Sequence, residues 1–232
     1  MSPEATFHAP FNFNSLSNDQ CIDKIRFEKH QVVELVILLG VEGIRTRERS
    51  VASGVEGICI VLYKLAVPVR WVDLEDFFGR DASGLSNIFL HVLTYIDKKY
   101  DRLLYVYHDY VAQNLQDYAD AVFDAGGLLQ NVWAFIDGTV RGICRPRTRH
   151  IKRDGMFMSQ KSVYNGHKRK HALEYQTLTT PDELIVHLYG PFPRRNHIKL
   201  FQDSKILNDT GFRGFRVYGD QAYGNDPILC CP

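Results

Sequence analysis

The segment "NVWAFIDGTVRGICRPR", residues 131–147, holds the pattern that decides the fold of the second half of the chain. A β-branched and aromatic run ends on Asp137 and Gly138, and arginines follow. Such a run is typical of a buried β-strand. The acid has two interpretations. Asp-Gly is common turn chemistry at a strand end, but a carboxylate there can also hold a cation while the arginines hold an anion.

Further strand-like runs follow and predict a mixed α/β sheet. Pro181 and Asp182 form a turn signal between two of these runs, so the two runs are predicted to pair as a hairpin. A helix is expected before the last strand. The hairpin runs, the helix and the last strand cover residues 172–180, 184–190, 197–209 and 215–224.

Asp137 and Asp220 occupy matching places, because each follows a strand-like run and lies next to a glycine. If the two strands are neighbours, the carboxylates converge on one edge of the sheet. Hard oxygen ligands of this kind suit Mg²⁺ or Mn²⁺ rather than zinc. Carboxylate-held metals can activate water and stabilise the leaving oxygen in phosphodiester cleavage. The alternative is a pair of ordinary strand-end turns.

The first half of the chain predicts a bundle of helices. Gly40 is expected to end the first helix and Ser83 to cap the fourth. The predicted helices cover residues 21–40, 55–66, 71–79, 83–96 and 111–127. A buried helix, a short helix, a turn with a glycine and a longer amphipathic helix form the layout of helix-turn-helix DNA readers. A purely structural bundle has the same short connections. The predicted organisation is an irregular leader at 1–20, a helical bundle at 21–128 that is helix-turn-helix-like at 55–104, and a sheet domain at 129–232.

The formal net charge of +1 gives no argument for nucleic acid, but residues 137–171 contain ten lysines and arginines against two acids. This basic window predicts contacts with a phosphate backbone, or else it is a solvated basic surface. The residues assigned to nucleic-acid contact are Arg141, Arg145, Arg147, His167, Lys168, Arg169 and Lys170. Tyr164 and Gly166 lie in the same "YNGHKRK" segment, which is assigned to positioning nucleic acid.

The remaining patterns exclude several classes of protein. Five scattered cysteines without a CxxC pair disfavour a disulfide framework and a zinc site, and they fit a reducing compartment. The apolar run at residues 32–40 is too short to span a bilayer, and no signal peptide is visible. There is also no zinc-protease spacing, nucleophile elbow or phosphate-binding loop. We expect a soluble intracellular protein of the nucleus or cytoplasm, without a membrane partner.

Four motifs, "FIDGTVRGICRP", "QKSVYNGHKRKHALEYQTLTTPDELIVHLYGP", "DSKIL" and "YGDQAYG", together resemble the PIF/Harbinger transposase group over roughly residues 131–229. The nuclease domain of that group is a DDE superfamily endonuclease with an RNase H-like fold. The resemblance implies that Asp137 is the first metal-binding acid and Asp220 the acid of the "GD-x-x-Y" motif, with Mg²⁺ or Mn²⁺ as cofactor and DNA as substrate. Residues 50–105 resemble the helix-turn-helix region upstream of that domain. The family commonly acts with a separate Myb-like partner protein.

Two departures from the family pattern reduce the expected activity. Where the family usually reads His-Asp, this chain has His197 followed by Ile198, and isoleucine cannot coordinate a cation. Asp203 is not expected to substitute. The family's glutamate lies on a helix further downstream, and this sequence stops at Pro232, so the RNase H-like sheet is expected to be incomplete there. A missed exon would explain the absent glutamate but not Ile198.

We therefore expect a truncated or decayed relative whose cleavage is impaired. The alternative is a non-catalytic nucleic-acid or protein-binding remnant of a domesticated or decayed transposon.

Overall fold

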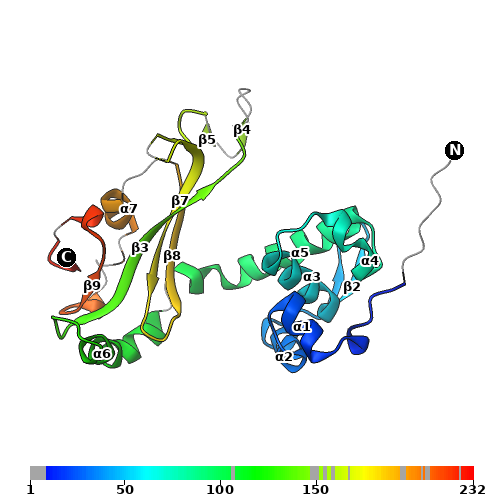
Figure 1. The fold of residues 1–232 in the computed structure, drawn as a ribbon, viewed down its shortest axis with the longest axis horizontal. Helices are drawn as coiled ribbons and strands as arrows, with labels where there is room; N and C mark the ends of the chain where they lie inside the picture. Colours follow the sequence, from blue (N-terminus) through cyan, green and yellow to red (C-terminus); the bar gives the residue numbers. More distant parts are fainter. Residues whose placement is uncertain are drawn as a thin grey trace. The chain divides into compact units, whose positions relative to one another are not determined.

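The computed structural model describes residues 9–105, 108–146, 152–153, 156–157, 160–166, 168–193, 197–204, 206, 210–224 and 226–232 (Figure 1). The chain divides into two compact units, Met1–Tyr100 and Asp101–Pro232. The sequence prediction set the boundary near residue 128 instead. The difference arises because helix α6 (His108–Asp124) packs against strand β3 (Val132–Gly142) and therefore belongs with the sheet.

The first unit contains helices and one small hairpin. Its helical elements are η1 (Phe13–Ser15), α1 (Asn18–Ile25), α2 (Lys29–Leu39), α3 (Gly54–Ala66), η2 (Trp71–Leu74), α4 (Glu75–Phe78) and α5 (Ala82–Tyr105), whose last residues lie beyond Tyr100. Strands β1 (Gly43–Arg45) and β2 (Val51–Ser53) pair in antiparallel register. This hairpin was not predicted, because two strands of three residues are too short to show a period.

The predicted helix at residues 21–40 is two helices. Arg26 adopts a left-handed conformation with φ 66° and ends α1. That helix begins inside the predicted leader, where Ser17 and Gln20 form a capping box. The end at Gly40 is confirmed, since this residue has φ 66° and its N–H bonds to α2 carbonyls.

Helix α5 begins slightly earlier than predicted, because its cap is Asp81 rather than Ser83. An Asp81 carboxylate oxygen accepts the backbone N–H of Gly84 at 3.1 Å, and it also accepts the Ser83 hydroxyl. The predicted apolar face is confirmed: its core positions, Leu85, Ile88 and Val92, are buried.

The second unit is built on a mixed sheet, as predicted. Its further elements are β4 (Lys152–Arg153), β5 (Met156–Phe157), β6 (Tyr164–Asn165), β7 (Lys170–Thr179), β8 (Ile185–Phe192), α7 (His197–Ser204), η4 (Thr210–Phe212), β9 (Arg216–Tyr218), η5 (Gln221–Tyr223) and β10 (Leu229–Cys230). The strand order is β10–β9–β3–β7, and β8 and β6 also pair with β7. Strand β7 is antiparallel to β3 and β8, which confirms the predicted hairpin, while β9 is parallel to β3 and β10.

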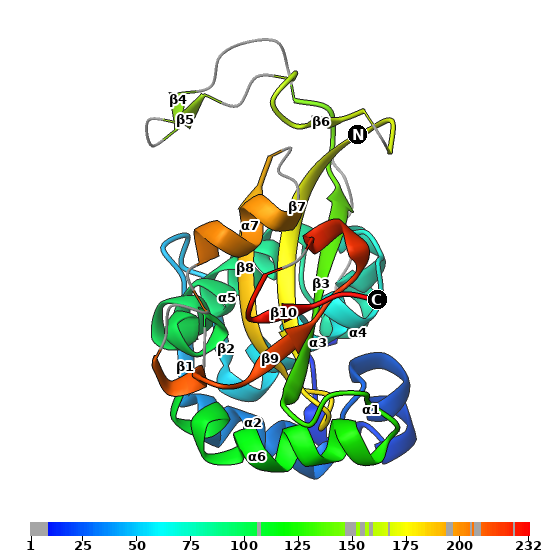
Figure 2. The same cartoon turned by 90° about the vertical axis from the view of Figure 1, so that its left-hand side faces the viewer.

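The core of the second unit lies on one side of this sheet. One cluster joins α6 and α7 to the buried strand residues, and α7 lies over β7 (Figure 2). Strand alternation places Phe135, Tyr218, Ile185 and Leu188 on the other side, where all four are exposed. In the part of the chain that the structure describes, no helix has the length and apolarity to cross a bilayer.

Candidate metal and nucleic-acid site

Asp137 lies in β3, and Asp220 follows β9, the parallel neighbour of β3. The register of β3 and β9 sets Phe135 opposite Tyr218, and each acid follows its member of that pair by two residues. The two rings are in edge contact, with centroids 6.2 Å apart. Neighbouring strands lie about 4.8 Å apart, so this register places the two acids in the same region at the end of β9.

The sequence predicts Asp137 at a strand end, but the residue lies inside β3. The strand continues because β7 supplies partners: Asp137 pairs with Thr177, and Gly138 pairs with Gln176. Gly138 therefore does not make the expected turn. Asp137 is exposed, and its Oδ1 accepts the backbone N–H of Gly138 at 2.8 Å. Among the described residues its Oδ2 has no hydrogen-bond partner, so one oxygen is available to a ligand.

Asp220 follows β9 and caps the short helix η5, where its Oδ1 accepts the backbone N–H of Ala222 at 3.1 Å. The preceding Gly219 is buried. A Cβ at this glycine would lie 2.7 Å from Cγ2 of Ile136 and 3.1 Å from the ring of Tyr223. The strand end can approach β3 this closely only without a side chain, so Gly219 sets the position of Asp220.

The buried phenol of Tyr223 lies beside both acids. Burial raises the pKa of Tyr223, and the charges of Asp137 and Asp220 raise it further. One hydroxyl is thus within electrostatic reach of both carboxylates, which agrees with the strand register. The phenol keeps its proton at neutral pH and adds no third negative charge. The pKa of Cys231 is also raised, by burial and by Asp220, so this thiol stays neutral as well.

Asp137 and Asp220 fit one hydrated divalent cation, and the described residues offer no protein ligands for a second. Both carboxylates are exposed, and within the described residues neither forms an ion pair. Carboxylate oxygens with several waters are a normal Mg²⁺ environment. No group of three metal-ligating side chains occurs among the described residues. Asp203 pairs with Lys199 at 3.1 Å within α7, and its exclusion as a substitute for the missing acid stays a prediction.

The position where the family has its further acid lies at the start of α7. His197 and Ile198 begin this helix, which contacts η5 and hence the element that Asp220 caps. The side chains of both residues are outside the described part of the chain. The missing ligand at position 198 stays a prediction from the residue type.

The predicted nucleic-acid contacts that the structure describes lie at one end of the β3–β7 pair. Gly142, near the end of β3, lies against the Lys170 side chain at the start of β7. Arg141 is four residues along β3 from Asp137, or about 14 Å in an extended strand. The exposed members are Arg141, Arg145, Lys168, Arg169 and Lys170. The other two predicted contacts, Arg147 and His167, lie outside the described residues.

This basic end holds a hollow of about 390 Å³, lined by Arg145, Gln160, Lys161, Tyr164 and His171. Nε and Nη2 of Arg145 donate to Gln160 at 3.2 and 3.0 Å, which fixes the guanidinium group. The rings of Tyr164 and His171 are in edge contact at 5.3 Å. Three of these residues, Gln160, Lys161 and His171, were not among the predicted contacts, whereas Tyr164 lies in the segment that was assigned to positioning nucleic acid. The signal was present in the sequence, because all three lie in the basic window, but only the fold gathers them around one hollow.

Comparison of the chain with protein-family models, with curated proteins and with solved structures found no match.

Proposed function

We propose that this chain is a transposase-derived, DNA-endonuclease-like protein that binds one divalent cation, Mg²⁺ or Mn²⁺, through Asp137 and Asp220. The observation that supports the proposal is that β3 and β9 are parallel neighbours and that each acid follows the pair Phe135–Tyr218 by two residues. The basic end of the β3–β7 pair would hold the DNA backbone, and its hollow combines cations with a stacking ring.

The fold supports this proposal at a coarser level. Strand β3 has antiparallel β7 on one side and parallel β9 on the other, and a mixed sheet of this kind is compatible with an RNase H-like domain. In the first unit, α4 and α5 are joined by three residues that include Gly79 with φ 63°. Such a connection is compatible with a helix-turn-helix, although α4 is only four residues long.

The chemistry divides between the cation and the protein. A bound divalent cation lowers the pKa of a coordinated water and neutralises charge on a phosphate. Asp137 and Asp220 hold the ion, and Arg141 and Arg145 hold the phosphate backbone. The proposed site has two protein carboxylates, so its affinity for a divalent cation is low. We therefore propose slow, impaired cleavage rather than full transposase activity.

Metal binding is the first test. Titration with Mn²⁺, followed by the electron paramagnetic resonance signal of the free ion, should show one site in the wild type. Asp137→Asn and Asp220→Asn should each weaken that site at least about tenfold, or about 1.4 kcal/mol. Asp117→Asn is the matched control, because Asp117 is an exposed acid of α6 without a partner among the described residues. Equal affinity in all four proteins would refute the shared site.

DNA cleavage is the second test. We expect slow nicking of supercoiled plasmid that requires Mg²⁺ or Mn²⁺ and is lost in Asp137→Asn. Equal nicking by both proteins would remove Asp137 from the mechanism.

A second candidate function is a non-catalytic nucleic-acid or protein-binding remnant, with a Myb-like protein as a candidate partner. It is favoured by the absence of a three-ligand metal group among the described residues and by the hollow of the basic window. DNA binding whose affinity falls steeply with added salt, without any cleavage, would support this candidate over the first.

A further inference from the structure

We infer that the β1–β2 hairpin of the first unit is a separate nucleic-acid contact that binds DNA phosphates through Arg45, Arg47 and Arg49. None of the residues named above as nucleic-acid contacts lies in this unit, and the helix-turn-helix-like region at 55–104 begins after the hairpin. The inference rests on the proposed function only in taking DNA as the partner. Its three arginines fall within "RTRERS", residues 45–50, a stretch that the sequence patterns did not single out.

The buried face of the hairpin packs against helix α3. Ile44 and Ala52 pair across the two strands, and both are buried. Ile44 packs on Gly57 of α3, where a Cβ would lie only 2.1 Å from Cδ1 of Ile44. Because side chains alternate along a strand, Arg45 and its partner Val51 face away from the helix, and both are exposed.

An ion pair also braces the base of the hairpin. The Arg80 guanidinium binds both carboxylate oxygens of Glu56 on α3, and its Nη2 donates to the Val51 carbonyl of β2 at 2.7 Å. The Arg80–Glu56 contact is partly buried, and it raises the pKa of Arg80. Arg80 therefore stabilises the hairpin and is not counted among the proposed DNA contacts, which are Arg45, Arg47 and Arg49.

Backbone hydrogen bonds around Thr46 hold the tip in shape. The Thr46 N–H donates to Ser50 O at 2.9 Å, Arg49 N–H donates to Thr46 O at 3.0 Å, and Ser50 N–H donates to Thr46 Oγ1 at 3.1 Å. Thr46 is buried. The arginines therefore project from an ordered turn, so less conformational entropy is lost when they bind a ligand.

The tip carries unneutralised positive charge. Arg45, Arg47 and Arg49 are exposed, and within the described residues none of their guanidinium groups forms a hydrogen bond or an ion pair. Glu48 is the acid among them, which leaves a net charge of +2 over residues 45–50. Free guanidinium groups match phosphate oxygens in a fork geometry.

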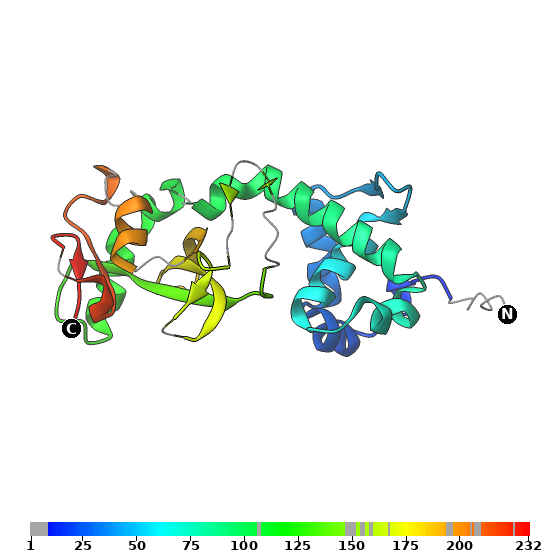
Figure 3. The same cartoon turned by 90° about the horizontal axis from the view of Figure 1, so that it is seen from above.

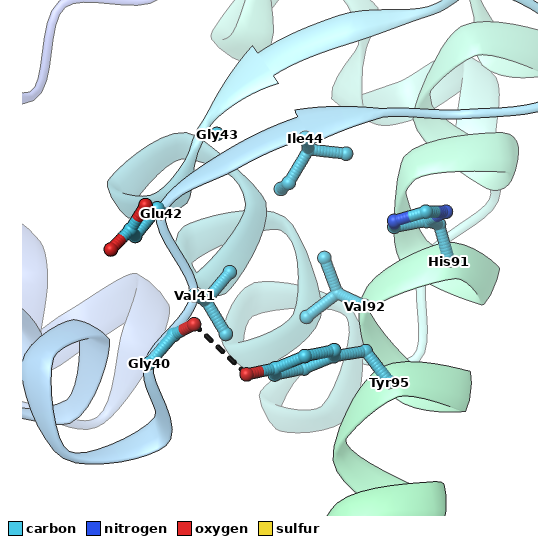
Figure 4. Close-up of a pocket in the computed structure, with 8 residues that line it drawn as sticks. All are labelled: Gly40, Val41, Glu42, Gly43, Ile44, His91, Val92 and Tyr95. Atoms are coloured by element: carbon cyan, nitrogen blue, oxygen red, sulfur yellow. Dashed lines mark hydrogen bonds between the residues drawn. The ribbon is translucent and has the colours of Figure 1, made fainter.

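The neighbouring helix favours DNA over an acidic protein as the partner. The hairpin lies alongside α5 (Figure 3), and the two meet around a hollow of about 170 Å³ that includes Ile44, His91 and Val92 (Figure 4). This hollow is smaller than most ligand pockets, so we assign binding to the outer surface. On α5, Leu90, His91, Thr94 and Asp97 are exposed, and His91 lines the hollow. A helix and a two-stranded ribbon are the two elements that the major groove admits.

The test is the salt dependence of DNA binding by the full chain, measured as fluorescence anisotropy of a labelled duplex. Arg45→Gln/Arg47→Gln should reduce the slope of log affinity against log NaCl by about 1.8, which is about 60-fold in affinity at 0.1 M. Arg45→Lys/Arg47→Lys should retain the slope, because phosphate contact depends mainly on charge. Arg26→Gln/Arg102→Gln removes two other exposed cations and serves as control.

The outcomes separate this inference from the proposed function. An unchanged slope in the glutamine variant, or an equal loss in the control, would overturn the hairpin contact while leaving the acid pair in place. If poly-glutamate bound tightly and the glutamine variant lost the same affinity for it, the hairpin would recognise acidic polymers in general. That result would also overturn the inference of a DNA contact. Asp137→Asn should bind DNA like the wild type, so a failure of metal binding or cleavage leaves the hairpin result standing.

Discussion

At the scale of single residues, Gly219 and Asp220 have different roles within one short motif. The "YGDQAYG" pattern identifies Asp220 as a candidate ligand, but the glycine beside it is explained by packing. Its missing side chain lets the end of β9 lie against Ile136 and Tyr223. The acid pair therefore depends on a residue without functional atoms of its own.

Gly219→Ala should destabilise the second unit by about 1–3 kcal/mol, because the added methyl group overpacks a filled space. Urea unfolding followed by circular dichroism measures this difference. Gly142→Ala is the control in the same sheet, since its Cβ would meet only Lys170 Cδ at 3.9 Å. This control should change stability by less than about 0.5 kcal/mol. Similar losses in both variants would contradict the packing explanation.

At the scale of elements, the turn between β7 and β8 is tied to helix α6 by one carboxylate. Asp182 accepts the hydroxyls of Tyr118 at 2.8 Å and Tyr110 at 3.2 Å, and it also accepts the Thr180 hydroxyl within the turn. Burial opposes the charge of Asp182, but the hydrogen bonds from Thr180 and Tyr118 outweigh it, so the pKa of Asp182 is lowered. Asp182, part of the turn signal in the sequence, thus also holds α6 against the β7–β8 turn.

Asp182→Asn should lower the free energy of unfolding at pH 7 by about 1.5–3 kcal/mol, the range for hydrogen bonds to a charged group. A carboxyl group whose pKa is lowered by folding stabilises the folded state at pH values above its unfolded pKa of about 3.9. This stabilisation is lost as the pH falls through the folded pKa. The difference in unfolding free energy between Asp182→Asn and the wild type should therefore become smaller below about pH 4. Urea unfolding at several pH values measures it.

Glu183→Gln is the matched control, because Glu183 is an exposed acid of the same turn whose carboxylate has no hydrogen-bond partner among the described residues. A pH-independent loss in the Asp182 variant would show that shape, and not charge, holds the turn.

At the scale of the whole molecule, each compact unit has its own core. One cluster contains Ile58 and the helices of the first unit, and the other contains Leu178 and the sheet. The two tryptophans of the chain are divided between the units, with Trp71 in the first and Trp133 in the second. Fluorescence can therefore report each unit separately.

Leu178→Ala should shift the urea transition reported by Trp133 in a Trp71→Phe background, by about 2–5 kcal/mol. The transition reported by Trp71 in a Trp133→Phe background should stay in place. Ile58→Ala should give the reverse pattern. If either core variant moved both transitions equally, the two units would unfold as one and the division into two cores would be wrong.

The sequence alone determined the mixed sheet, the β7–β8 hairpin and the buried face of α5, because these depend on local periodicity and turn residues. It also identified Asp137 and Asp220 as a pair, although their assignment to metal remains a proposal. Only the tertiary structure decided that Asp137 lies inside β3, since the length of that strand depends on partners in β7. The alignment of the two acids and the β1–β2 hairpin likewise depend on pairing between segments. No local pattern encodes the register of strands whose acids are 83 residues apart.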